Sequence, residues 1–318
     1  MIITVTIPTY RRLPDLKRCL EALQNQTRPA NQVLVIIRNT DTETWQFFET
    51  FDPNFLPLRT VKVKVPGVVA AMNAGLEVAQ GDIIAFTDDD AAPHTDWLAR
   101  IENHFLSDQR IGGVGGRDMI YYHGELWTTE TKQVVGRLQW FGRLIGNHHI
   151  GVGAARDVDI FKGVNMSFRR NAIKALRFDE RMRGTGAQVD FEVPFCLTLK
   201  RNGWKLIYDP NVVVNHYPAP RFDEDQRYQF NAVALTNAVH NETLALLEHL
   251  PRLQQIIFII WATLVGTRKS PGLVQWLRFL PSQGSLAGQK WLASMQGRWQ
   301  GWLTWQGSRI GSVVKSKP

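Results

Sequence analysis

The 318-residue sequence is poor in cysteine, and its two cysteines, Cys19 and Cys196, can build neither a disulfide framework nor a four-cysteine metal site. The chain begins with an apolar, β-like run at residues 2–7, and no basic, cleavable leader precedes it. The remaining composition, with 44% hydrophobic and 21% charged residues, is typical of a globular protein. These observations predict a folded protein of the reducing cytoplasm.

Acidic residues are missing from the last part of the chain. Residues 250–318 carry nine Lys or Arg and no Asp or Glu, whereas the other residues have 28 basic and 29 acidic side chains. The same segment contains six of the eleven tryptophans. We therefore predict a domain at residues 1–235 and a basic, Trp-rich helical extension at residues 236–318.

A long apolar run is also missing. Residues 256–266 form an apolar stretch of eleven residues, whereas a transmembrane helix needs about 20. Trp291, Met295, Trp299 and Trp302 recur at the spacing of one helix face, which beside basic residues is typical of a helix lying among lipid headgroups. We predict peripheral association with the cytoplasmic face of a membrane; the alternative is a helical pair packed on the rest of the protein. Nucleic acid is not the expected partner, because the basic excess is confined to this segment.

Strand and helix patterns alternate over the first 90 residues. Apolar runs predict strands at 2–9, 32–38 and 82–86, and an alternating pattern predicts one at 58–65, with helices at 13–26 and 67–81 between them. This alternation predicts an α/β fold with a mostly parallel sheet flanked by helices. Ligands of such sheets bind beyond the carboxyl ends of the strands, where residues 8–12, 38–41 and 88–90 would meet.

Three consecutive carboxylates, Asp88, Asp89 and Asp90, follow the last of these strands. Carboxylate oxygens are hard ligands suited to Mg²⁺ or Mn²⁺, and such a cation bridges to a diphosphate that the acids alone would repel. The alternative is capping of the next helix, but Thr95 or Asp96 is enough for one cap. The triple therefore predicts a divalent metal site.

Four sequence blocks in order, "VTIPTYRR", "GVVAAMNAGLEVAQGDIIAFTDDDAAPHTDWL", "FKGVNMSFRR" and "GWKLIYDPNVVVNH", span residues 4–216. Together they resemble the glycosyltransferases of family 2. The resemblance implies a GT-A fold of Rossmann-like type, a nucleotide-sugar donor, a divalent metal and inversion at the anomeric carbon. We expect the acceptor to be a hydroxyl group of a lipid-linked or polysaccharide molecule.

The resemblance also assigns nucleotide-sugar contacts, although strand termination and a polar helix surface are the alternatives. The positions concerned are Pro8, Thr9, Tyr10 and Asn73. Family members usually carry an acid after the second strand, where this chain has Arg38. A cation cannot accept a hydrogen bond from a uracil imide. Either Asp41 takes that role, or Arg38 contacts a phosphate or another base.

For the metal, the resemblance makes Asp90 the main contact, with Asp88 beside it. Asp88 and Asp89 would also hold ribose or sugar. His216 follows an apolar strand at the place where a histidine approaches the metal in many GT-A enzymes, although a lone histidine is more often structural.

The segment "GTGAQVDFEVPF" at residues 184–195 stands where the family shows Glu-Asp at the start of a helix. An inverting transfer needs one carboxylate to remove the proton of the acceptor hydroxyl. Glu192 and Asp190 are the candidates, and an N-terminal helix acid is the alternative for either. A nucleotidyltransferase is disfavoured, because "PTYRRLPD" lacks the glycine-rich loop it would need. The Gln-x-x-Arg-Trp signature of processive synthases is missing too, which favours addition of one sugar per encounter.

Overall fold

A computed structural model describes residues 1–318 except 53–55, 228 and 316–318, with side chains up to Ser308 in the last helix. The chain groups into two compact units. The first comprises residues 1–137, 145–178 and 195–219, and the second comprises residues 138–144, 179–194 and 220–318. The sequence-based boundary at residue 235 stays a prediction about separately folding domains.

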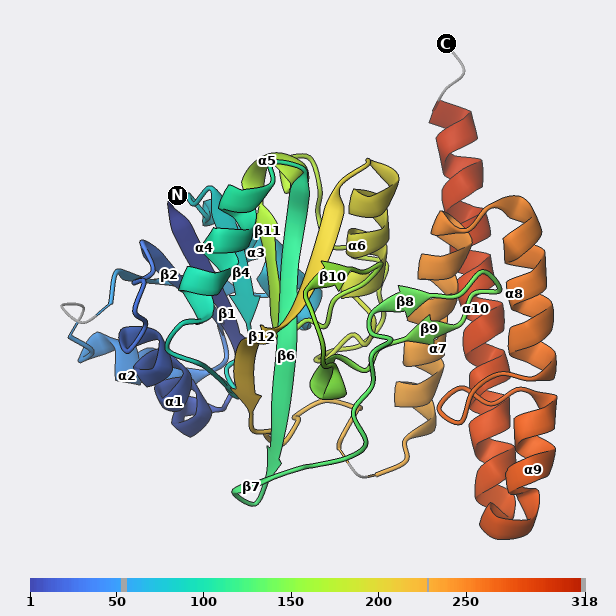
Figure 1. The fold of residues 1–318 in the computed structure, drawn as a ribbon. Helices are drawn as coiled ribbons and strands as arrows, with labels where there is room; N and C mark the ends of the chain where they lie inside the picture. The colour runs from blue at the N-terminus through green and yellow to red at the C-terminus, as the bar shows by residue number, and fades with distance from the viewer. Residues whose placement is uncertain (53–55, 228, 316–318) are drawn as a thin grey trace. The chain divides into compact units, whose positions relative to one another are not determined.

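The first unit starts with four parallel strands (Figure 1). In spatial order they are β3 (Leu58–Val63), β2 (Gln32–Arg38), β1 (Ile3–Thr9) and β4 (Ile83–Thr87). The connecting helices are α1 (Leu13–Gln24), α2 (Thr42–Glu49) and α3 (Val68–Val78). β2 and β4 are apolar at successive positions, and β1 alternates apolar residues with threonines; all three strands are buried on both faces, as expected for parallel strands covered by helices. The α/β prediction is confirmed.

The sheet continues beyond β4 with one short and two long strands. β11 (Asn165–Arg169) is antiparallel to both β4 and β6 (Ile111–Tyr122), and β12 (Lys205–His216) is parallel to β6. The strand direction therefore reverses from β4 to β11 and again from β11 to β6. As a result β6 and β12 end at the same edge of the sheet as β1 and β4. Short strands complete it: β5 (Ala91–Pro93), β7 (Glu125–Leu126) and β10 (Arg156–Asp157).

The sequence pattern predicts a strand pair at 205–216 and a helix at 171–178, and both differ from the structure. β12 is one strand, because "DPN" shifts the register on β6 between Asp209 and Val213 without turning the chain back. The predicted helix shortens to α5 (Arg170–Ile173). Two other helices of the chain are α4 (Trp97–Ser107) and α6 (Glu192–Arg201).

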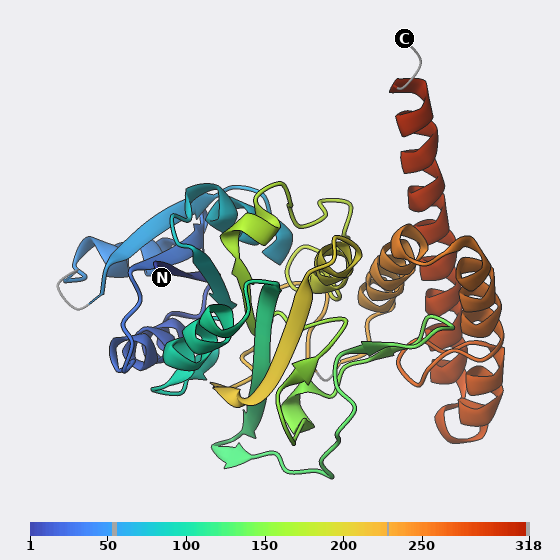
Figure 2. The same cartoon turned by 45° about the horizontal axis from the view of Figure 1, so that its top comes forward.

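The second unit is mainly helical. Its helices are α7 (Ala232–His249), α8 (Arg252–Leu264), α9 (Leu273–Gln283) and α10 (Ser285–Lys315). α10 packs closely along α7 because glycines face it: a Cβ atom at Gly297 or Gly301 would lie 2.6 or 2.7 Å from a carbonyl oxygen of α7. Figure 2 shows α10 running among the other helices of this unit. No helix in the described part of the chain has the length and apolar character needed to cross a membrane.

Two β-bridged dipeptides, β8 (Arg137–Leu138) and β9 (Leu144–Ile145), form a small hairpin. The turn between them packs on α8, where the rings of Phe141 and Trp261 lie 5.1 Å apart. The sequence pattern predicts a mobile loop at 142–158. Within this segment the structure has β9, a 3₁₀ turn at His148–Ile150 and β10, and its mobility stays a prediction.

Candidate functional site

Strand register brings His216 next to the acid triple. The short strand β5 follows Asp90 directly and pairs with β12, so that Ala91 lies opposite His216. The backbone N–H of Tyr217 also donates to the carbonyl oxygen of Asp90, at 2.8 Å. One ligand atom each of Asp88, Asp90 and His216 lies within 4.8 Å of the other two. Two carboxylates and an imidazole thus converge at the carboxyl edge of the sheet.

The side chain of His216 is oriented like that of a metal ligand. Its buried Nε2 lies 3.4 Å from Asp90 Oδ1 and makes no hydrogen bond of good geometry with a described residue. Its Nδ1 lies 3.5 Å from Asp118 Oδ2, and Asp118 forms an ion pair with Lys162. A carboxylate behind a histidine fixes the imidazole ring in many metal sites. This donor set, two hard oxygens and one imidazole nitrogen, fits Mn²⁺ or Mg²⁺.

The electrostatics around His216 are strongly negative. Burial acts to lower the pKa of His216, but the carboxylates of Asp118 and Asp90 outweigh it and raise the pKa to about 9. Burial likewise opposes ionisation of Asp118, yet Lys162 and His216 hold its pKa below the usual range. Positive charge is therefore favoured between these carboxylates. A divalent ion would balance their negative charge better than a single proton.

The side chain of Asp89 contacts another side chain of this protein. It is buried and accepts a hydrogen bond from Arg12 Nη1 at 2.9 Å, and the same nitrogen lies 3.7 Å from Asp90 Oδ2. Burial raises the pKa of Asp89 to about 7, with Arg12 acting in the opposite direction and Asp90 adding to the rise. Arg12 thus offsets part of the charge of the triple, and sugar binding by Asp89 stays a prediction.

Two predicted nucleotide contacts from different strand ends meet. The guanidinium of Arg38 lies 4.8 Å from the ring centroid of Tyr10, because β1 and β2 are adjacent and parallel. Thr9 is buried, and Pro8 is half-buried beside it. Asp41 is buried and caps α2, accepting hydrogen bonds from the backbone N–H groups of Arg11 and Thr44 and from the Thr44 hydroxyl. This occupation of Asp41 favours Arg38 over Asp41 as the ligand contact after β2.

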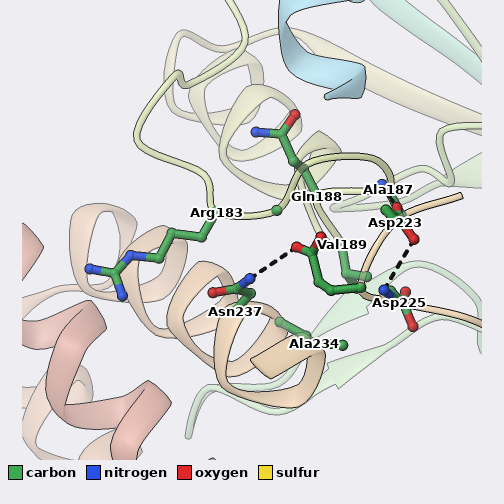
Figure 3. Close-up of a pocket in the computed structure, with 11 residues that line it drawn as sticks. Arg183, Ala187, Gln188, Val189, Asp223, Asp225, Ala234 and Asn237 are labelled. Carbon is green, nitrogen blue, oxygen red and sulfur yellow. Dashed lines mark hydrogen bonds between the residues drawn. The ribbon is translucent and has the colours of Figure 1, made fainter. Parts of the chain in front are cut away.

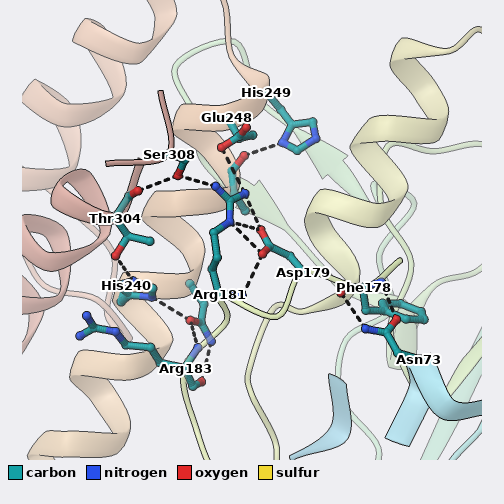
Figure 4. A network of polar contacts seen from close by, with 12 residues as sticks. Asn73, Phe178, Asp179, Arg181, Arg183, His240, Glu248, His249, Thr304 and Ser308 are labelled. Carbon is teal, nitrogen blue, oxygen red and sulfur yellow. Dashed lines mark hydrogen bonds and ion pairs between the residues drawn. The ribbon is translucent and has the colours of Figure 1, made fainter. Parts of the chain in front are cut away.

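Asn73 makes a structural contact in the first unit (Figure 4). Its side chain donates to the carbonyl oxygen of Phe178 at 3.0 Å and accepts from the Phe178 N–H at 2.8 Å. The side chain is buried. Both halves of the amide are thus engaged with one peptide segment, and a nucleotide contact by Asn73 stays a prediction.

The two candidate base residues, Asp190 and Glu192, lie in the second unit. The segment just before them is hydrogen-bonded to α7. The buried side chain of Asn241 accepts a hydrogen bond from the N–H of Arg183 at 2.7 Å and donates to the carbonyl oxygens of Arg183 and Val189, at 2.9 and 3.0 Å. Gln188 and Asp190 have left-handed backbone conformations, with φ of 40° and 67°. Such conformations are uncommon outside glycine and concentrate at functional sites.

The carboxyl group of Asp190 has an unusual electrostatic environment. Burial raises its pKa to about 8, and the nearby carboxylates of Glu192 and Glu242 add to the rise. Glu242 is paired with the buried Arg298 of α10 at 2.7 Å. Glu192 is the first residue of α6. A carboxyl group with a pKa near 8 is suited to proton transfer at physiological pH.

More polar contacts tie the same loop to its own unit. Arg181 pairs with Asp179 and Glu248 and donates to Ser308 Oγ at 2.7 Å (Figure 4). On the other side, acids of residues 223–225 accept from Thr185 and from the N–H of Ala187, and a small pocket lies between them and α7 (Figure 3). The segment at 179–191 is thus fixed by side chains that sequence spacing does not reveal.

Comparison with known proteins agrees with this architecture. The sequence profile described as Glycosyl transferase family 2 matches residues 4–177. The chain is 33% identical over 123 residues to Glycosyltransferase AglE of Haloferax volcanii. This aligned region covers 38% of this chain and only 40% of AglE. It is 23% identical over 231 residues to the Glucosyl-dolichyl phosphate glucuronosyltransferase of the same organism, covering 68% and 69% of the two chains.

Among solved structures, GalNAc-T7 with UDP, GalNAc and Mn²⁺ has a TM-score of 0.62 and 12% identity, over 77% of this chain and 48% of that one. The likeness shows a shared GT-A fold. The family profile covers more than half of the chain, and a group of two aspartates of the D-x-D type, Asp88 and Asp90, stands at the expected strand end. The chain is a glycosyltransferase and belongs to glycosyltransferase family 2.

Proposed function

We propose that this chain is a metal-dependent, inverting transferase that moves a sugar from a nucleotide-sugar donor to a hydroxyl group of a lipid-linked or polysaccharide acceptor. The observation that carries the proposal is the convergence of Asp88, Asp90 and His216 at the edge where Tyr10 and Arg38 also lie. The names of two similar proteins support it. The structure of GalNAc-T7 contains UDP and Mn²⁺, and the name of the Haloferax volcanii glucuronosyltransferase includes glucosyl-dolichyl phosphate. Nucleotidyl transfer has no comparable support.

In this proposal the residues have separate tasks. A cation held by Asp88, Asp90 and His216 would supply electrostatic stabilisation to the departing diphosphate. Asp190 or Glu192 takes the proton of the acceptor hydroxyl while the oxygen attacks the anomeric carbon. The bond from that carbon to the diphosphate oxygen breaks, and the diphosphate leaves with the electron pair.

A panel of nucleotide sugars tests the proposed function. With Mn²⁺ or Mg²⁺ present, we expect one donor to raise the midpoint of thermal unfolding and to be hydrolysed slowly without acceptor, because ligands that bind the folded state stabilise it. The same donor with a chelator is the control and should give neither effect. If no donor in the panel gives a metal-dependent response, the proposal is wrong.

The contact between Asp118 and His216 gives a second prediction. Asp118→Asn should weaken Mn²⁺ binding by about 10- to 100-fold, because the ring loses the carboxylate that orients it and raises its basicity. Titration calorimetry of the full chain measures the effect without any donor. Asp209→Asn is the matched control, because Asp209 accepts a similar bond from His104 in the same unit, at 2.8 Å. Equal Mn²⁺ affinity in Asp118→Asn and the wild type would exclude the orienting role.

A further inference from the structure

The second unit exposes two apolar helix faces. On α8, Leu253, Ile256, Ile260 and Leu264 recur every three or four residues and are 50–70% exposed, while Phe258 on the opposite face is buried. One apolar side chain at the surface is ordinary, but four in register on one helix are a continuous strip. This strip is the apolar run that sequence reading assigns to a helix too short to cross a bilayer.

The next helix, α9, repeats the pattern. Leu273, Val274, Leu277 and Leu280 are 38–53% exposed, and no residue of α9 is buried. A helix of a globular protein normally buries its apolar side chains against the core, so these two strips lack the cover that such faces usually have. The connection between the helices is eight residues long, at 265–272, so both strips lie in one continuous segment of the chain.

Charge indicates what covers the strips. Arg252 begins α8, Arg268 and Lys269 lie in the connection, and Arg278 lies on α9, all of them exposed. No acidic residue occurs from 250 to 318. A second copy of the same surface would bring these cations together across a symmetric interface. An anionic lipid surface would instead attract them while its acyl boundary accepts the apolar strips.

We propose that the exposed strips of α8 and α9 dock this chain on an anionic lipid surface. The two helices lie in the headgroup layer with their leucine and isoleucine side chains in the acyl boundary, and the flanking arginines bind lipid phosphates. Docking needs neither donor, metal nor catalysis. It can therefore be tested independently of the transferase proposal.

This assignment differs from the helix face predicted from sequence. Within that face, Trp291 stacks on Trp276 of α9, with ring centroids 4.9 Å apart, and is half-buried. Trp302 stacks on Trp299 at 5.0 Å, and of these Trp299 is 58% exposed. Apolar spacing identifies a helix face without telling whether protein or lipid covers it. Part of the α10 face packs within the protein, and α8 and α9 carry the more exposed strips.

Vesicle sedimentation tests the proposal on the full chain. We expect the wild type to pellet with phosphatidylcholine vesicles containing phosphatidylglycerol, and to stay in solution with phosphatidylcholine alone. Ile256→Ser with Ile260→Ser should lower the bound fraction by about tenfold, because two apolar groups leave the boundary. Arg268→Gln with Arg278→Gln should lower it too and weaken its dependence on salt.

Leu106→Ser is the matched control, since Leu106 lies on α4 in the first unit and is 59% exposed, like Ile256. It should bind vesicles as the wild type does. The proposal is overturned if the α8 double variant pellets normally, or if neutral and anionic vesicles bind equally. It is also overturned if analytical ultracentrifugation shows a dimer that the α8 variant dissociates while vesicle binding persists. Circular dichroism confirms that each variant is folded before it is scored.

Discussion

Asp90→Asn should abolish metal-dependent donor binding. Asp90 Oδ1 faces His216 Nε2 at 3.4 Å, and Oδ2 accepts from the N–H of Ala219 at 3.0 Å. An asparagine keeps one oxygen for the backbone contact but presents no charge to a cation. We expect Mn²⁺ affinity to fall by more than the roughly 10- to 100-fold typical of losing an outer contact. Calorimetry with Mn²⁺ and thermal protection by donor measure the two losses.

The control for this substitution is Asp96→Asn. Asp96 lies six residues further on, and its side chain is 41% exposed and pairs with Arg100, so its loss should leave metal and donor binding unchanged. Circular dichroism must show that Asp90→Asn keeps the wild-type fold. A folded Asp90→Asn protein that still binds donor in a metal-dependent way would remove Asp90 from the proposed site.

Glu192→Gln and Asp190→Asn should separate donor binding from transfer. Whichever carboxylate removes the acceptor proton, its amide should lower the transfer rate by about 10²- to 10⁴-fold while donor protection stays intact. Asparagine tolerates the left-handed conformation at position 190, so Asp190→Asn changes charge without adding backbone strain. Single-turnover transfer and thermal protection by donor are the two measurements.

The pH profile distinguishes the two carboxylates. With its pKa near 8, Asp190 carries a proton at pH 6 to 7 and loses it as the pH rises. If Asp190 is the base, the wild-type rate rises by about tenfold per pH unit below pH 8 and then levels off. Glu180→Gln, an exposed acid of the same loop, is the control. Normal transfer by both amide variants would place the base elsewhere.

Much of the first unit follows from local patterns. Apolar runs predict β1, β2 and β4, and alternation of apolar and polar residues predicts β3. The rule that strand ends share an edge brings Asp88 to Asp90 together with Tyr10 and Arg38. For His216 the family resemblance, not the local pattern, implies a place near the metal. The structure shows that the pairing of β5 with β12 places His216 beside Asp90.

Other features depend on contacts that a single sequence does not encode locally. Asp118 lies in the middle of a glycine-rich strand pattern, and only the register of β6 on β12 puts it behind His216. Asn241 reads as an ordinary polar residue of α7, yet it binds a loop more than 50 residues earlier. The exposure of Ile256 and Ile260 is equally hidden, because an apolar run alone does not tell whether other helices cover it.

The hydrogen bonds of Asn241 to residues 183–189 have a consequence for protein engineering and for the evolution of this family. A chimera that exchanges the C-terminal helices of this chain for those of another family member would leave the loop of Asp190 without its hydrogen-bonding partner, even though the two are distant in sequence. Recombination that keeps function must therefore exchange residues 179–194 and the C-terminal helices as a pair. Acceptor choice, if it depends on that loop, would then be inherited with the tail rather than with the nucleotide-binding half.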